Sequence, residues 1–511
     1  MKRIIWFIFA FLFAETLGAA ETQTDVTENG KKYIVTETTI YPRAPGSVTV
    51  EHTFLLPIFE QKNENAALVY AELFADYAAY DNGRYTEIVR NEDQFFEQVK
   101  ELALAPEAEF SVTKAKKLLE SVPTLDDVFR RADKCTYCDW NFPIYGITTP
   151  ELAWDIRMPQ FQMMRHFARL WLLKIRIAAA ENRLGDALDD LAMGMRLAER
   201  LANNKILILD LAGTNCANLF DTALGQILSR PDAPNLFWTS IEWRNRPFGS
   251  DAYYTETDMT VTFFPGLFYV WSKRETLPES EWQKFAAVAA ERIRLWKGPI
   301  CDDAEQIMEK LTPLESAADY RPMAEAWLRE HGQTAETIAS MSNEKCLGLA
   351  VAGETMEHWS AMRRFNALSM NDWNQVAPFF AMKPLSETVD RPLDYLYGCF
   401  EASVYEFFKS RTRFVWNRDL RVFGEAISWY AAENDGRLPE SMAQLRQWAK
   451  TPRESGLPQS YTKIVLPLPM LDPFTDEPYD FTYQDGAIIF ELAPENSMEV
   501  YGLRRIFRKA P

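Results

Sequence analysis

The sequence predicts a mainly α-helical protein with a short N-terminal β segment and a small C-terminal α+β module. Apolar residues recur every three or four positions over most of the chain, which is the spacing of one buried helical face. β-branched residues are concentrated before residue 60, and strand-like runs separated by turn residues return near the C-terminus. Because their connections are short, the helices are expected to form a helical hairpin array or bundle.

The first twenty residues, 1–20, have the pattern of a signal peptide. Lys2 and Arg3 precede an apolar core of residues 4–14, and small residues at 18–20 form the cleavage site. This apolar core is too short to span a bilayer as a helix. We therefore expect an exported protein, periplasmic or extracellular, with no stable membrane span after signal cleavage. The alternative is an N-terminal segment that stays uncleaved and anchors the protein to a membrane.

The rest of the chain divides into three predicted parts. Residues 21–60 are a β-rich segment, 61–408 a helical domain, and 409–511 a small α+β module. In the first part, residues 33–40 and 47–50 are rich in β-branched side chains and flank proline and glycine, which predicts a hairpin.

Three helices are expected to follow one another between residues 151 and 230. Pro159 suits the first turn of the first helix, residues 181–185 end it, and Asp186 is a candidate N-cap for the second. Pro231 ends the third helix. Short connections make consecutive helices antiparallel neighbours. Residues 179–188, between the first and second helices, resemble part of a tetratricopeptide unit. No 34-residue period is sustained, so a regular repeat solenoid is not predicted.

The C-terminal module has its own pattern of turns. An amphipathic helix carries Phe423 and Tyr430, and strands at 479–483 and 487–491 are joined by a favourable hairpin turn. A basic run at 504–509 is expected to be a solvated tail.

Composition excludes several classes of function. The chain has a net charge of −18, and a strongly acidic surface repels phosphate backbones, so no nucleic-acid binding is expected. The sequence contains no HExxH, GxSxG, P-loop or strand-linked GxGxxG motif, and its four histidines are scattered. No cofactor and no metal site are predicted, no catalytic residue is identified, and an enzyme is the less favoured interpretation.

The stretch from Cys135 to Trp140 is the most conspicuous short motif. A structural disulfide between Cys135 and Cys138 is the leading interpretation in an exported chain. The alternatives are unpaired or differently paired cysteines, a redox site, and half of a zinc site. Asp139 and Trp140 follow directly and form a candidate surface site. Residues 472–476 could offer oxygen ligands to calcium, with a simple turn as the favoured alternative.

Several segments together resemble a known family. They are residues 65–70, 138–140, 167–170, 180–188, 326–332, 430–441 and 472–475, with a hairpin turn at 485–486. In these segments the chain is similar to a family of uncharacterised planctomycete exported helical proteins. Proteins of this family carry a pseudopilin-like C-terminal module of the kind found in type II secretion. The family has no assigned reaction, so the resemblance implies architecture and not activity. The N-terminus lacks the processing site and glutamate-bearing helix of a pilin, so the module looks like a reused fold.

Three hypotheses about function follow. The first is an exported, non-catalytic helical scaffold or protein-binding protein of the cell envelope, whose partner is another envelope protein. The second is a cell-envelope glycan or peptide hydrolase that uses dispersed carboxylates, although the sequence does not show which acids would form the pair; Asp139 and Asp155 are examples only. The third is a secretion-system accessory protein, which only the C-terminal resemblance suggests.

Overall fold

The fold is described from a computed structural model of the chain. It defines residues 22–28, 30–45, 52–78, 92–140, 159–204, 207–246, 248, 264–296, 316–365, 372, 392–454, 463–493 and 501–510. The predicted signal peptide, the strand predicted at 47–50 and Asp155 lie outside these residues.

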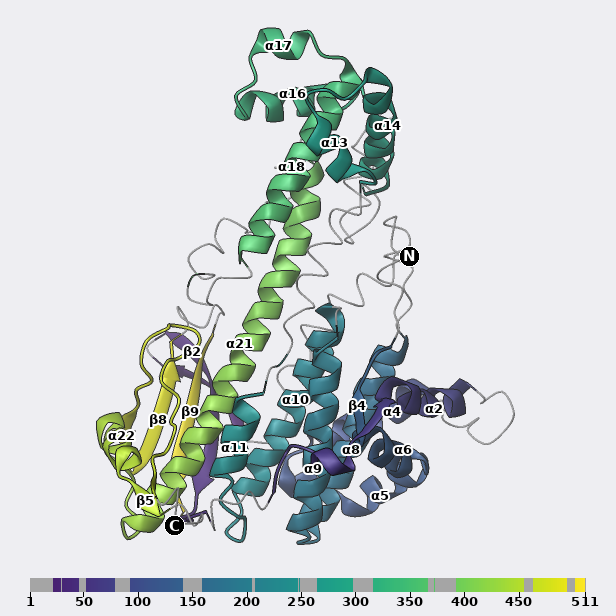
Figure 1. Cartoon of the computed structure of the whole chain (residues 1–511). Helices are drawn as coiled ribbons and strands as arrows, with labels where there is room; N and C mark the ends of the chain where they lie inside the picture. The colour runs from purple at the N-terminus through teal and green to yellow at the C-terminus, as the bar shows by residue number, and fades with distance from the viewer. Residues whose placement is uncertain are drawn as a thin grey trace.

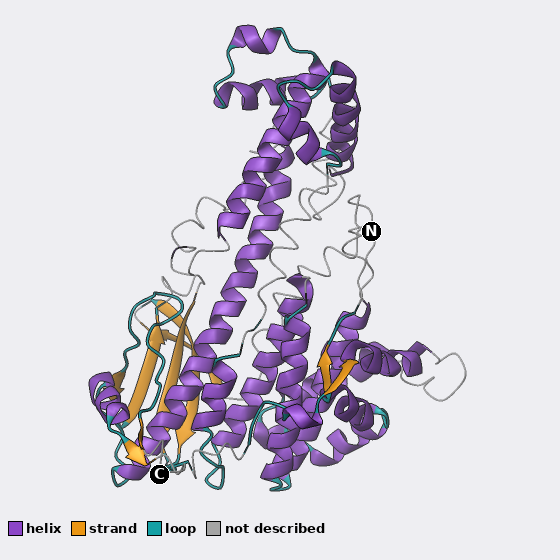
Figure 2. Cartoon of the chain, viewed as in Figure 1, coloured by secondary structure: helices purple, strands orange, loops and turns teal. Residues whose placement is uncertain are grey.

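The protein has a broad base, a stem of two long helices and a head at the far end of the stem (Figure 1). The stem consists of α18 (Asn343–Phe365) and α21 (Pro392–Glu433). The head holds α13 (Leu267–Lys273), α14 (Glu279–Trp296), α16 (Arg321–Glu330) and α17 (Ala335–Ala339). The predicted fold class is confirmed: the protein is mainly helical, with a short N-terminal strand segment and a small C-terminal strand group (Figure 2).

The base is organised around the three consecutive helices that the sequence predicts. They are α8 (Pro159–Ala180), α9 (Leu184–Ala202) and α10 (Leu207–Leu228). Around them lie α2 (Ala66–Ala78), α4 (Glu92–Leu104), α5 (Val112–Glu120), α6 (Leu125–Asp133) and α11 (Phe237–Arg244), with two 3-10 turns, η1 (Ile58–Glu60) and η3 (Glu107–Glu109). Apolar side chains of these helices, including the fully buried Trp171, form the core of the base.

The connection between α8 and α9 is tighter than the sequence predicts. Asn182 adopts a left-handed backbone conformation, with φ of 59°. The backbone N–H groups of Arg183 and Asn182 donate to Ala178 and Ala179 and close the end of α8. The next helix therefore begins at Leu184, and Asp186, predicted as its N-cap, lies inside its first turn instead.

The sheet joins the two ends of the described chain. Its strand order is β1-β2-β9-β8-β7, and the central pair, β2 and β9, is parallel. The strands are β1 (Thr22–Glu28), β2 (Lys31–Ile40), β7 (Thr482–Gln484), β8 (Ala487–Leu492) and β9 (Tyr501–Lys509). The described partners of β2 are thus β1 and β9. The N-terminal segment and the C-terminal module share one sheet, and α21 continues across position 408.

The basic run near the C-terminus is not a solvated tail, as predicted, but the strand β9. Acidic side chains of neighbouring strands pair with it: Arg504 contacts Glu28 at 2.8 Å and Glu491 at 2.6 Å, and Arg508 contacts Glu37 at 2.6 Å. Leu503 and Phe507 of β9 belong to a hydrophobic core to which α21 also contributes, and Arg505 between them is buried. The module also contains α22 (Met442–Lys450) and the short pair β5 (Arg453–Glu454) and β6 (Lys463–Ile464).

Candidate functional site

The CxxC stretch lies in a short parallel ribbon beside the helices of the base. Its strands are β3 (Lys62–Asn65) and β4 (Cys135–Tyr137). The side-chain amide of Asn65 donates from Nδ2 to the carbonyl of Asp139 at 2.7 Å and accepts from the backbone N–H of Asp139 at 2.8 Å. These two hydrogen bonds hold the backbone that leads from β4 to Trp140.

Two arginines of α9 hold this ribbon to the base. Arg200 donates to the backbone carbonyls of Asp133 at 2.5 Å and Cys135 at 2.6 Å. Arg196 makes a two-pronged contact with the Asp133 carboxylate at 2.6 and 2.7 Å and reaches the carbonyl of Phe54. Charge-assisted bonds of this kind are strong and directional. Asp133 is buried, so the arrangement fixes the ribbon rather than presenting a reactive group.

Cys135 and Cys138 are free thiols. Cys135 is the first residue of the strand β4 and Cys138 follows its last residue, and in an extended segment Cα atoms three residues apart are separated by about 10 Å. A disulfide needs Cα atoms within about 7 Å of each other. The predicted disulfide would thus require the strand to bend, and its formation in an oxidising compartment stays a prediction. Burial raises the pKa of both thiols, that of Cys138 to about 12, which disfavours the thiolate that redox chemistry or zinc binding needs.

We expect Cys138 to react slowly with alkylating reagents in the folded protein. A pKa of about 12 leaves a thiolate fraction on the order of 10⁻⁴ at pH 8, against roughly a quarter for an ordinary cysteine. A pulse of iodoacetamide followed by peptide mass spectrometry should therefore label Cys138 at least about a hundredfold more slowly than in the urea-unfolded protein. Labelling of Cys138 at the unfolded rate would contradict this burial.

Apolar side chains around the ribbon are exposed. Phe59 is 97% and Ile58 73% exposed in η1, Leu68 is 71% exposed in the first turn of α2, and Tyr137 is 49% exposed at the end of β4. We call these four residues the ribbon surface. Nearby, Asp139 is exposed, and the half-buried Trp140 stacks on Tyr70 with ring centroids 6.3 Å apart. The candidate surface site predicted from the sequence therefore lies beside the ribbon surface.

A second group of charged side chains is buried where α21 contacts the base and the C-terminal module. Arg421 pairs with Asp221 of α10 at 3.1 Å. Asp419 pairs with Arg244 of α11 and accepts a hydrogen bond from the Tyr479 hydroxyl at 3.1 Å. Burial raises the pKa of the Asp419 carboxyl. Because packed elements enclose Asp221, Asp419 and Arg421, these three groups join the base to the stem and are closed to a substrate.

Asp210 of α10 is fully buried near the same helix. Burial raises the pKa of its carboxyl to about 7, although the Arg411 cation and a long contact from the Thr214 hydroxyl act in the opposite direction. Its Oδ2 atom has no hydrogen-bond partner among the residues described. A neutral, protonated carboxyl is therefore favoured at this position at mildly acidic pH.

This carboxyl should make stability depend on pH. Between its ordinary pKa near 4 and its folded value of about 7, the folded protein keeps a proton that the unfolded chain has released. The contribution of Asp210 to the free energy of unfolding then falls as pH rises through this window, by up to about 1.4 kcal/mol per pH unit. Urea unfolding of wild type and Asp210→Asn should show wild type losing stability relative to the variant between about pH 5 and 7.5. Parallel pH profiles would contradict the shift.

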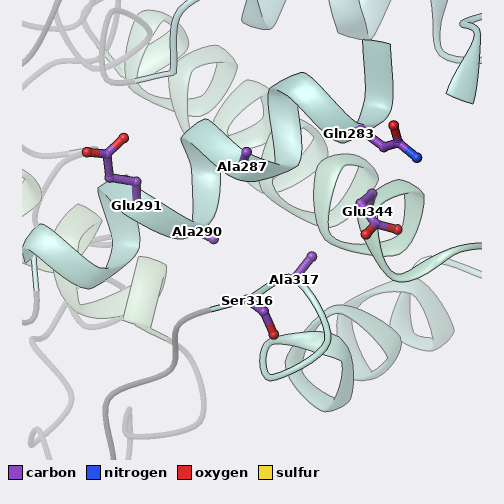
Figure 3. A pocket seen from close by; sticks show the side chains of 7 residues that line it. All are labelled: Gln283, Ala287, Ala290, Glu291, Ser316, Ala317 and Glu344. Carbon is purple, nitrogen blue, oxygen red and sulfur yellow. The ribbon is translucent and has the colours of Figure 1, made fainter. Parts of the chain in front are cut away.

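The described part of the head contains a pocket of about 420 Å³ (Figure 3). Ala287 and Ala290 of α14 lie along it, and Ala317, from the segment before α16, lies across from them. Glu291 and Glu344 stand at opposite ends of the pocket. Gln283 and Ser316 complete the lining. A volume of this size is in the usual range for small-ligand sites.

No group of three or more His, Cys, Asp or Glu side chains that could hold a metal ion occurs within the described ranges. Residues 472–476 form a turn, the favoured of the two predicted alternatives. The Asp472 carboxylate accepts from the backbone N–H of Phe474 at 2.8 Å, and the backbone N–H of Asp476 donates to the Asp472 carbonyl.

The pocket glutamates and the ribbon surface were not singled out from the sequence. Glu291 and Glu344 are ordinary polar positions of two separate helices, and only packing brings them to one pocket. The sequence does contain a signal for the ribbon surface at Phe59, because Ile58 and Phe59 are consecutive apolar residues after Pro57 and before a polar stretch.

Comparison with known proteins finds no matching family model, no matching curated protein and no matching solved structure. In the helices that the structure describes, none is long and apolar enough to cross a membrane.

Proposed function

We propose that this protein is an exported, non-catalytic helical scaffold of the cell envelope that binds another envelope protein. The observation that carries the proposal is the ribbon surface, where Phe59 is almost fully exposed in the turn before β3 and Leu68 and Tyr137 are exposed close to the paired ends of β3 and β4. Large exposed apolar side chains that gather in one region are typical of protein-binding sites. The arginine contacts beneath the ribbon support a preformed surface, which lowers the entropic cost of binding.

Buried acids support a non-catalytic role. Burial raises the pKa of Asp210, Asp419 and Glu425, and each of the three is less than 5% exposed in a contact between helices. The hydrolase alternative has weaker support, since the pocket glutamates stand at opposite ends of the pocket and do not face each other across a bond to be cleaved. The secretion-accessory alternative rests on the C-terminal resemblance alone.

A photo-crosslinking experiment tests the proposed binding surface. Phe59 is replaced by a benzophenone amino acid, and Met470, an exposed apolar residue of the C-terminal module at 64% exposure, is replaced in the matched control. After irradiation of cells, we expect one envelope protein to be linked at position 59 and not at position 470. Adding Leu68→Asp should weaken that link. Equal capture at both positions, or none at position 59, would count against this surface.

A further inference from the structure

The head pocket combines an apolar floor with unneutralised negative charge. Ala287, Ala290 and Ala317 present only methyl groups along its length. Within the described part of the chain, neither Glu291 nor Glu344 makes a hydrogen bond or an ion pair. Among the residues that the structure describes, no cationic side chain pairs with either carboxylate.

The two carboxylates are well separated. From Gln283 to Glu291 the lining residues of α14 span eight positions, which corresponds to about 12 Å along a helix. Glu344 lies near the Gln283 end (Figure 3). It belongs to the first turn of α18, where the helix dipole favours a negative charge. Two separated anions with methyl groups between them match a ligand that carries ammonium groups on an alkyl chain.

We propose that this pocket binds primary alkylammonium groups, either as a free α,ω-diamine or as the lysine side chain of a peptide. The alkyl chain packs on the three alanines, and an ammonium group pairs with Glu291, Glu344 or both. Arginine fits less well, because its planar guanidinium binds best to a single carboxylate through two parallel hydrogen bonds. This inference is independent of the ribbon surface, which lies at the other end of the molecule (Figure 1).

Ligand-detected NMR with the full-length protein tests this site. The probes are 1,5-diaminopentane, its mono-N-acetyl derivative and 1,5-pentanediol. We expect saturable binding of the diamine with an affinity in the micromolar to millimolar range, weaker binding of the mono-acetyl derivative and none of the neutral diol. A lysine-containing peptide and its Nε-acetylated form distinguish the sources: binding of the free lysine peptide as tight as that of the diamine assigns the site to a peptide side chain, and weaker binding assigns it to a free diamine.

Matched variants locate the binding. Glu291→Gln and Glu344→Gln should each weaken diamine binding roughly two- to fivefold, and the double variant should abolish it. Glu336→Gln removes one exposed acid from α17, outside the pocket, and should leave binding unchanged. Melting temperatures close to that of the wild type would show that the variants are folded. Absence of diamine binding up to about 10 mM, or equal binding by the double variant, would overturn the proposal.

Discussion

Replacing Asp221 with alanine is expected to lower the free energy of unfolding by about 3–5 kcal/mol. The Asp221 carboxylate faces the Arg421 guanidinium with three contacts of 3.1 to 3.2 Å, and both side chains are almost completely buried between α10 and α21. Without Asp221, the buried arginine cation loses its directly paired carboxylate, which is more costly than removal of both charges. Urea denaturation followed by tryptophan fluorescence measures the effect.

A double variant separates these two costs. Asp221→Leu combined with Arg421→Met removes both charges, so it should be clearly more stable than Asp221→Ala alone. As a control, Glu281→Gln breaks the contact with Lys284 on the surface of α14, and the unfolding midpoint should hardly move. A loss below about 1 kcal/mol for Asp221→Ala would show that the pair is not a joint between stem and base.

Replacing Gly213 with alanine is expected to destabilise the base by about 3 kcal/mol. At this position α10 approaches the backbone of α9 so closely that an added Cβ would lie 2.6 Å from the Ala198 carbonyl oxygen and 2.7 Å from the Cα of Ala202. Backbone atoms cannot move aside as a flexible side chain would, so the helices must separate. Thermal and urea unfolding both report the loss.

The same helix hairpin offers a matched control for this substitution. Gly185 in the first turn of α9 has no atom within 4 Å of an added Cβ. Gly185→Ala should therefore stabilise the protein by about 0.5–1 kcal/mol through higher helix propensity. If the two substitutions had effects of the same sign, the close contact between α9 and α10 would not be the cause.

The helices of the base were predictable because their signals are local. Apolar spacing, Pro159 and Pro231 indicate α8 to α10 without knowledge of the fold. Asp186 was misassigned as a cap because the left-handed conformation of Asn182, which shortens the connection, depends on hydrogen bonds that sequence spacing does not show.

Pairing between distant segments was not predictable. The basic run forms β9, where Glu28, Glu37 and Glu491 of neighbouring strands pair with Arg504 and Arg508, and two of these acids lie more than 450 positions away along the chain. The pocket has the same origin, since only the packing of α14 on α18 brings Glu291 and Glu344 to the lining of one pocket.

In-cell cross-linking with mass spectrometry on the unmodified protein tests most directly whether it is an exported scaffold for one envelope partner. Lys62 and Lys134 are exposed lysines on and beside the ribbon and can report contacts there. We expect a single envelope protein to be linked reproducibly through these lysines. This expectation would be contradicted if no partner were linked while soluble envelope fragments raised the melting temperature of the protein, because that result would indicate a ligand-binding or enzymatic role instead.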